Sequence, residues 1–272
     1  MKSQPILLVG CGKMGGALLD GWLSKGMAEN DLVVIEPHGF DRTGIRSGIT
    51  VLEDLKDLKT DFSPEVILFA VKPQVLDTVV PLYKNFKAEG LVYISIAAGR
   101  TLASYESLLG SAAGIIRVMP NTPASIGQGI SVACGNRNVT DAQKENCLEL
   151  FKAVGVTAWI DEEGLMDPVT AVSGSGPAYV FLLIEALTEA GSRAGLKREF
   201  AEKLAKVTVA GSGALALEAR ESPANLREAV TSPGGTTSAA LAVLMGESGM
   251  KKLMEQAVQA CLLYTSPSPR DS

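Results

Sequence analysis

The chain has 272 residues, 46% hydrophobic and 20% charged, a composition typical of a globular protein rather than a disordered one. Its formal net charge of -5 leaves no basic surface for phosphates, so no nucleic-acid partner is expected. The apolar runs at 6–9 and 179–184 are too short for a secretory signal or a membrane span, and no membrane contact is expected. Four cysteines without Cys-x-x-Cys spacing favour reduced thiols in a cytoplasmic protein.

The first part of the chain alternates short apolar runs with helix-like segments. Branched runs of this kind are typical of strands buried on both faces of a parallel sheet, and they lie at 6–10, 32–35, 66–70, 92–96 and 115–119. Helices are expected at 15–25 and 76–86, then one capped by Thr140, and a last strand at 157–160. The fold class is therefore α/β, with a Rossmann-like, doubly wound sheet over residues 1–161.

Strand signals disappear after Asp161, and residues 162–260 are expected to form an all-α C-terminal domain. Residues 177–194 are apolar nearly all round, and a helix without a polar face must be buried on every side. This pattern predicts that subunits pack together here, in a dimerisation domain; the alternative is a helix running through the middle of its own domain. Residues 261–272 contain two prolines and several serines, which indicates a non-native or disordered tail.

Gly10, Gly12 and Gly15 form a Gly-x-Gly-x-x-Gly pattern between a predicted strand and a predicted helix, the context of a dinucleotide site. The first glycine permits a tight turn, the second lets the backbone approach a pyrophosphate, and the third lets the helix pack on the sheet. Glu36 follows the second strand, where an acid bonds the ribose hydroxyls, which favours NADH. Arg42 and His38 could instead bind the extra phosphate of NADPH. A purely structural glycine loop is the alternative.

The single histidine, His38, falls in the expected adenosine-side loop and is badly placed for a general acid. Reduction of an imine fits better, because a protonated C=N is already electrophilic and needs only holding, orientation and a hydrogen bond at nitrogen. Two segments, 173–177 and 231–237, offer hydroxyls and N–H groups at helix N-termini that could hold a small carboxylate. For each segment, N-capping plus a turn is the alternative.

Several stretches together point to a family. The most specific are Ser-Gly-Ser-Gly-Pro-Ala-Tyr at 173–179 and Ser-Pro-Gly-Gly-Thr-Thr at 232–237, supported by 10–15, 70–73, 95–99 and 119–123. On these motifs the sequence, from residue 6 to about residue 260, resembles the pyrroline-5-carboxylate reductases. The resemblance implies NADPH- or NADH-dependent reduction of 1-pyrroline-5-carboxylate to L-proline, the last step of proline biosynthesis, by hydride transfer to the cyclic C=N carbon.

The motif and the resemblance also imply roles for individual residues. The cofactor would be lined by Val9, Gly10, Cys11, Gly12, Lys13, Met14, Gly15, Glu36, Ala70, Val71, Lys72, Pro73, Ile96, Ala97 and Ala98. The imine-carboxylate substrate would be bound by Glu163, Ser232, Gly234, Gly235, Thr236 and Thr237. By the resemblance Thr237 is catalytic, its hydroxyl bonding the ring nitrogen, while N–H groups of its loop bind the carboxylate. No metal ligand is expected.

The resemblance further implies a homodimer, in which the helical domain of one subunit meets the cofactor domain of another, with rings of dimers as a further step. A β-hydroxyacid dehydrogenase is similar in plan, but it places a catalytic lysine on a helix of its second domain. Here the helix after Pro177 has no lysine before Lys197, which counts against that class. A non-catalytic dinucleotide sensor is the remaining alternative, and it would leave the loop at 232–237 without a role.

Overall fold

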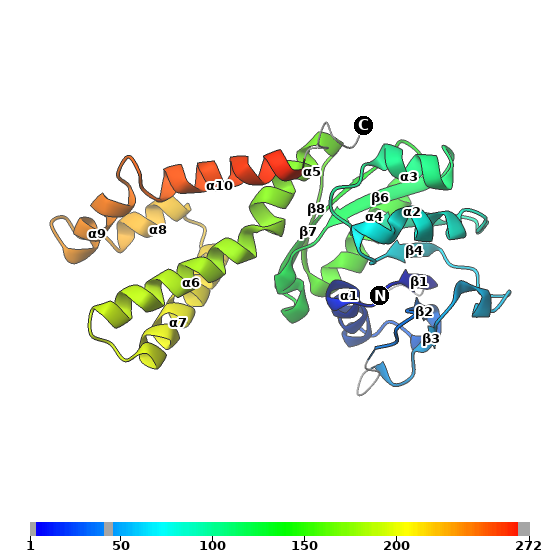
Figure 1. The fold of residues 1–272 in the computed structure, drawn as a ribbon, viewed down its shortest axis with the longest axis horizontal. Helices are drawn as coiled ribbons and strands as arrows, with labels where there is room; N and C mark the ends of the chain where they lie inside the picture. Colours follow the sequence, from blue (N-terminus) through cyan, green and yellow to red (C-terminus); the bar gives the residue numbers. More distant parts are fainter. Residues whose placement is uncertain (1–3, 41–45, 266–272) are drawn as a thin grey trace. The chain divides into compact units, whose positions relative to one another are not determined.

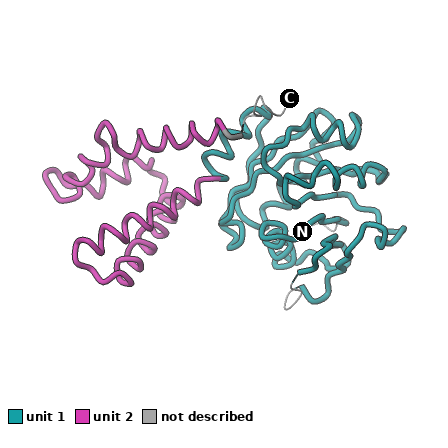
Figure 2. The backbone as a smooth tube through the Cα atoms, viewed as in Figure 1, with its two compact units in different colours: residues 1–174, 265–272 teal, residues 175–264 magenta. Residues whose placement is uncertain are grey.

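A computed structural model describes residues 4–40 and 46–265 of the chain (Figure 1). The chain divides into two compact units, the first running to Gly174 and the second from Ser175 to Tyr264 (Figure 2). Every strand of the described residues lies in the first unit, and the second is helical, as the α/β fold class with an all-α C-terminal part requires. The sequence predicts a domain boundary after residue 161, whereas the first compact unit continues to Gly174. Met166, in this additional segment, belongs to one of the two apolar cores of the first unit.

Eight strands form one sheet in the order β3-β2-β1-β4-β5-β6-β7-β8. Their bounds are β1 Ile6–Val9, β2 Leu32–Ile35, β3 Thr50–Leu52, β4 Val66–Phe69, β5 Val92–Ser95, β6 Gly114–Met119, β7 Gly129–Gly135 and β8 Gly155–Trp159. Neighbours run parallel except β6 and β7, which are antiparallel. Since β2 lies on one side of β1 and β4 on the other, the strand order reverses beside β1, the point at which open α/β sheets bind ligands.

The five predicted parallel strands are all present, and the predicted last strand is β8, shifted towards the N-terminus. Two strands were not predicted from the sequence: β3, which has three residues at the sheet edge, and β7, the antiparallel strand. The helix predicted at 76–86 is wrong in extent. There, α2 covers only Leu76–Val79 and continues as a 3-10 turn over Val80–Tyr83, because Pro81 has no N–H to extend the α-helical ladder.

Helices cover both faces of the sheet and bury two apolar cores. On one face α1 (Lys13–Ser24) and α4 (Asp141–Phe151) contribute Leu18, Trp22 and Phe151. On the other face α2, α3 (Leu102–Leu109) and α5 (Met166–Val169) pack on the strands. The predicted cap of α4 is confirmed as a capping box, in which Thr140 and Gln143 each bond the other's backbone N–H.

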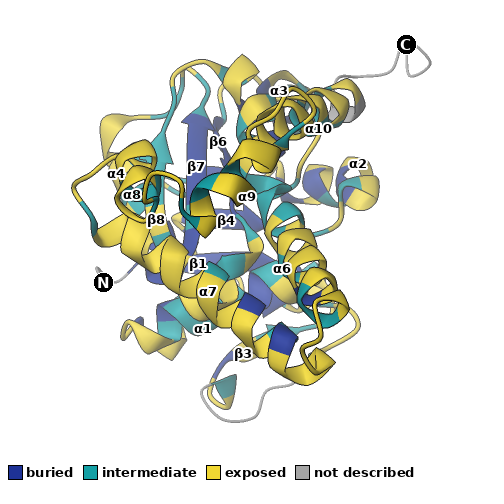
Figure 3. Cartoon of the chain, turned by 90° about the vertical axis from the view of Figure 1, so that its left-hand side faces the viewer, coloured by how far each residue is buried: buried dark blue, intermediate teal, exposed yellow. Residues whose placement is uncertain are grey.

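The second unit consists of helices that bury little within one chain. They are α6 Gly176–Arg193, α7 Arg198–Glu218, α8 Pro223–Ala229, α9 Thr236–Leu244 and α10 Met250–Thr265. Among its described residues, buried side chains are limited to Thr188, Ala201 and Ala205. On α6, Phe181 is 57% and Leu182 64% exposed, and these helices are mostly exposed in Figure 3. The alternative of a helix running through the middle of its own domain is therefore wrong.

The last helix runs further than the sequence predicts. Helix α10 continues through Cys261 to Thr265, so the expected end of the helix at Ala260 comes too early. The prolines and serines on which the prediction of a tail depends lie at 266–272, outside the described residues.

One helical stretch among the described residues has the length and composition of a membrane span. Glu163–Arg193 is 31 residues long with a mean hydropathy of 1.3 in its most apolar window, of which 6% is buried. The sequence-based exclusion of a span counts only the apolar run at 179–184, which ends before the charged residue Glu185, whereas the helix continues through that residue. A subunit interface would cover the same apolar surface.

The four cysteines are free, and three of them, Cys11, Cys134 and Cys147, are buried. Burial raises the pKa of Cys11 and of Cys134 from 9.0 to about 11, and it also raises the pKa of Cys147. A thiol ionises more readily in the unfolded chain than in these sites, so between pH 9 and pH 11 the unfolded state binds fewer protons than the folded state.

We therefore expect the free energy of unfolding to be insensitive to these thiols below pH 9 and to fall as the pH rises above it. The loss should be about 1 kcal/mol per buried thiol by pH 10. Urea denaturation followed by circular dichroism at pH 8, 9 and 10 measures it. The double variant Cys134→Ala/Cys147→Ala should show a smaller loss than the unsubstituted chain, and an equal loss would contradict the assignment.

Candidate functional site

Three segments predicted to line a cofactor leave the sheet side by side at its carboxyl edge. The N–H of Gly10 donates to Ile35 O at 2.8 Å, and the N–H of Ala70 donates to Val9 O at 2.7 Å. The N–H of Ile96 donates to Phe69 O at 3.1 Å. These bonds continue the strand ladders of β1, β4 and β5 by one residue. The segments after these strands therefore meet beside the reversal of strand order.

The three glycines of the loop differ in the space around their Cα atoms: at Gly10 and Gly15 other atoms of the protein occupy the place of a Cβ, and at Gly12 that place is open. Gly10 has φ +89°, and a Cβ there would lie 2.8 Å from Val71 Cγ1 and 2.9 Å from Ala70 O. A Cβ on Gly15 would lie 2.6 Å from the carbonyl oxygen of Gly10. At Gly12, by contrast, a Cβ would meet no heavy atom of the described residues within 4 Å beyond its chain neighbours. The open position is at the surface, at the start of α1.

The start of α1 has the donors that an anionic group needs. Gly12 is the N-cap residue, no side chain caps the helix, and no acidic residue occupies its first turn. The first N–H groups of a helix have no partner within the helix, and they carry partial positive charge. Together with the open space at Gly12, these groups fit a pyrophosphate, so the residues present match a dinucleotide.

Glu36 extends from the end of β2 to the glycine loop. Its Oε2 accepts from the N–H of Cys11 at 2.8 Å, and its Oε1 accepts from the N–H of His38 at 3.3 Å. The carboxylate therefore lies beside the loop, where the ribose of a dinucleotide is expected. His38 is exposed, as predicted for a surface loop residue, and Arg42 lies outside the described residues.

Arg46 is an additional residue of this region that was not predicted from the sequence. Its Nε donates to Asp20 Oδ1 at 2.6 Å and its Nη2 to Asp20 Oδ2 at 2.5 Å, a bidentate pair with α1. The guanidinium also lies over the ring of Phe40, 5.5 Å from its centroid. Arg46 therefore ties the segment before β3 to α1. Arg46 belongs to no recognisable motif, so its pairing with Asp20 could not be predicted from the sequence.

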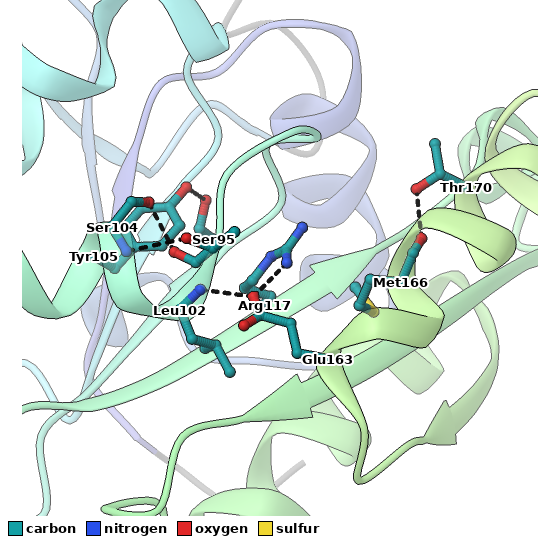
Figure 4. Close-up of polar contacts among 9 residues, drawn as sticks. Ser95, Leu102, Ser104, Tyr105, Arg117, Glu163, Met166 and Thr170 are labelled. Atoms are coloured by element: carbon teal, nitrogen blue, oxygen red, sulfur yellow. Dashed lines mark hydrogen bonds and ion pairs between the residues drawn. The ribbon is translucent and has the colours of Figure 1, made fainter. Parts of the chain in front are cut away.

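Glu163, predicted to bind substrate, lies in a polar cluster of the first unit (Figure 4). Its Oε1 accepts from the N–H of Leu102 at 2.6 Å and also pairs with Arg117 Nη1. Arg117 is buried on β6, and Ser95 lies opposite it on β5, where its hydroxyl bonds Tyr105 Oη at 2.5 Å. Arg117 was not predicted as a site residue. The sequence feature that could have identified it is a single charged residue inside an apolar run that is typical of a buried strand.

Both predicted carboxylate-binding segments lie at the start of a helix, but only the one at 231–237 is a non-helical turn before that helix. At 231–237 the N–H of Gly235 donates to Ser232 O at 3.0 Å, Gly234 has φ +72°, and α9 begins at Thr236. Thr236 and Thr237 are exposed. Because they lie in the first turn of this nine-residue helix, their N–H groups have no partner within it.

At 173–177, α6 begins at Gly176 after the N-cap residue Ser175, with Pro177 in its first turn, as predicted, but no loop precedes it. The chain is already helical from Met166 and passes through a π-helical turn at Thr170–Gly174 into α6. The Ser173 hydroxyl donates back to Val169 O at 3.0 Å, so it is used inside this turn. No group of three or more potential metal-binding His, Cys, Asp or Glu side chains occurs among the described residues.

The two kinds of glycine position predict opposite effects of adding a methyl group. Gly15→Ala should lower the free energy of unfolding by about 1–3 kcal/mol, because the Cβ would overlap the Gly10 carbonyl. Gly12→Ala should leave stability nearly unchanged but weaken NADH binding at least about tenfold, because its Cβ fills the space beside the helix N-terminus. Urea denaturation and fluorescence titration with NADH separate the two. Equal destabilisation by both variants would show that the loop is purely structural.

Comparison with known proteins places both parts of the chain. The family model described as pyrroline-5-carboxylate reductase dimerisation matches residues 163–266, and that described as NADP oxidoreductase, coenzyme F420-dependent, matches residues 5–99. A pyrroline-5-carboxylate reductase from Pseudomonas aeruginosa is 40% identical over 263 residues, which cover 96% of this chain and 95% of the relative. One from Synechocystis sp. is 42% identical and covers 93% and 94% of the two chains.

Solved structures show the same likeness. The pyrroline-5-carboxylate reductase of Coxiella burnetii superposes with a TM-score of 0.87 at 33% identity, covering 97% of this chain and 98% of the other. The pyrroline carboxylate reductase of Plasmodium falciparum, solved with NADP bound, superposes with a TM-score of 0.82 at 30% identity, with the same coverage. Because the likeness extends over nearly the whole chain, including the glycine loop and the loop before α9, this chain belongs to the pyrroline-5-carboxylate reductase family.

Proposed function

We propose that this chain catalyses the NADPH- or NADH-dependent reduction of 1-pyrroline-5-carboxylate to L-proline, the last step of proline biosynthesis. The observation that carries the proposal is the likeness to pyrroline-5-carboxylate reductases over 96% of the chain, and the two family models cover the glycine loop at 10–15 and the loop at 232–237. The geometry supports it, since the space at Gly12 and the helix N-terminus behind it fit a dinucleotide. The proposed setting is the cytoplasm, and neither nucleic acid nor a membrane has a role in the proposal.

The protein's own task in this reaction is to hold two charged molecules and to orient them. Bound reduced nicotinamide supplies the hydride for the C=N carbon. N–H groups in the first turn of α9 bind the substrate carboxylate through hydrogen bonds and the positive end of the helix. The Thr237 hydroxyl bonds the ring nitrogen and keeps the protonated imine in one orientation, so that hydride reaches a fixed face of the ring. No histidine or metal is required for this chemistry.

The proposal assigns the choice between NADH and NADPH to Glu36. A carboxylate that reaches the glycine loop suits the ribose hydroxyls and repels a 2′-phosphate, so NADH is the proposed preferred cofactor. Oxidation of NADH and of NADPH at 340 nm, with and without pyrroline-5-carboxylate, tests both the reaction and the preference. Cofactor binding without any imine-dependent oxidation would contradict the proposed reaction and favour a dinucleotide sensor.

Thr237→Ala should separate chemistry from cofactor binding. Loss of the hydroxyl is expected to lower turnover on the imine on the order of a hundredfold, because the ring nitrogen loses its orienting hydrogen bond. The Kd for NADH should change little, since the glycine loop is untouched. Ser238→Ala, one position further along α9, is the matched control and should keep wild-type turnover. Equal losses of turnover and of NADH affinity in Thr237→Ala would show a structural role instead.

We also propose that the active form is a homodimer formed through the helical unit, with rings of dimers as a further assembly step. The match to a dimerisation domain at 163–266 supports it, as do the apolar side chains that α6 leaves exposed in one chain. A second subunit then covers the surface that gives Glu163–Arg193 the composition of a membrane span.

Phe181→Asp should therefore convert the protein to monomers, because a buried unpaired charge strongly disfavours an apolar interface. Light scattering coupled to size-exclusion chromatography measures the mass in solution. Leu82→Asp is the control: Leu82 is 62% exposed but lies in the first unit, so that variant should keep the wild-type mass. If Phe181→Asp has the same mass as the wild type, α6 is not at the interface.

A further inference from the structure

A buried charge interrupts an apolar row at the carboxyl edge of the sheet. The strand register aligns Val9, Phe69, Ser95, Arg117 and Cys134 across β1, β4, β5, β6 and β7. Three of these five residues belong to the apolar core under α2 and α3, whereas Ser95 and Arg117 introduce polar groups into it. Arg117 is only 7% exposed. A charge buried to this extent is costly unless it is paired and hydrogen-bonded.

Glu163 supplies the pairing charge and at the same time holds the start of α3. Its Oε1 pairs with Arg117 Nη1 and accepts from the N–H of Leu102, the first residue of α3. The N-cap residue Thr101 is already used, because its hydroxyl accepts from the N–H of Ser104. One carboxylate therefore neutralises Arg117 and satisfies an N–H group that the cap of α3 leaves without a partner.

This arrangement fixes a loop at both ends. Residues 96–101 connect β5 to α3, and Ala97 donates its N–H to Ser95 Oγ at 3.2 Å at the first end. Glu163 fixes the other end through Leu102. Between them, Arg100 forms an ion pair with Asp77 of α2. The loop contains Ile96, Ala97 and Ala98, which follow β5 at the edge where the glycine loop follows β1.

We propose that Glu163 and Arg117 are positioning residues for the nicotinamide half of the cofactor. Their ion pair fixes loop 96–101, and that loop in turn orients the nicotinamide, so Glu163 acts through Leu102 and touches neither cofactor nor substrate. The inference rests on the proposed cofactor site, and it replaces the role of Glu163 in substrate binding that the family resemblance implies. The Arg117 Nε has no hydrogen-bond partner among the described residues, so the guanidinium depends on Glu163 for its compensation.

The test compares two ligands that differ only in the nicotinamide ring. ADP-ribose keeps the adenosine, the pyrophosphate and the second ribose of NADH and lacks only the nicotinamide ring, so its binding does not depend on contacts to that ring. For Glu163→Gln, calorimetry should show the Kd of NADH rising on the order of tenfold, while the Kd of ADP-ribose stays within about twofold. Glu149→Gln is the matched control, since it removes the charge of an exposed ion pair with Lys152, and both Kd values should remain at wild type.

A double variant distinguishes positioning from general damage. In Glu163→Gln/Arg117→Met the uncompensated charge is gone, so NADH should bind better than to Glu163→Gln alone. Amide hydrogen exchange at Leu102 should be faster in Glu163→Gln than in the wild type. Losses that add in the double variant, or equal weakening of NADH and ADP-ribose, would overturn the proposal. So would unchanged binding of both ligands by folded Glu163→Gln.

These binding measurements do not depend on the imine. If the wild type binds NADH but does not reduce pyrroline-5-carboxylate, the proposed reaction fails while the positioning role is still decided by the two Kd values. If the wild type binds neither NADH nor NADPH, both proposals are overturned.

Discussion

The constraint on which the first unit depends is the close approach of two backbones at the carboxyl edge of the sheet, between the ends of β1 and β4. Gly10 and Gly15 lie so close to the Ala70 segment and to each other that no side chain fits at either position. This approach places the start of α1 beside the segment after β4, with the open position at Gly12 at the N-terminus of the helix. The parallel sheet therefore brings the glycine loop against the Ala70 segment, and the cofactor site depends on this contact.

A second constraint acts across the sheet. Both cores of the first unit consist mainly of buried apolar side chains. Arg117 on β6, paired in register with Ser95 on β5, is an exception, because its buried charge cannot be solvated by the apolar core. Its compensation comes from Glu163, 46 residues later in the chain, at the beginning of the segment that matches the dimerisation model. The same carboxylate thus belongs, by sequence, to the helical part of the family and, by contact, to the loop after β5.

Much of this could be predicted, and the failures have physical causes. The apolar runs ending at Val9, Phe69 and Ser95 are buried on both faces, so their composition alone indicates parallel strands, and the glycine spacing indicates a dinucleotide loop after the first of them. Strand β7 (Gly129–Gly135) was missed because Gly, Ser, Ala and Cys fill most of its positions, a composition with a weak strand signal. The role of Glu163 depends on Arg117 and Leu102, neither of which shares a motif with it. The π-helical turn at Thr170–Gly174, directly before the start of α6, was missed because Ser and Gly favour non-helical turns locally.

The small interior of the second unit has a consequence for how this protein exists in a cell. Because so few of its described side chains are buried within one chain, these helices would gain most of their hydrophobic stabilisation, in the proposed homodimer, from the second copy. In that homodimer the folding of this half would be a bimolecular event, and its midpoint of thermal unfolding would rise with protein concentration. Newly made chains at low abundance would hold a finished sheet domain and an incomplete helical one, so the amount of enzyme synthesised itself governs how much of it is intact.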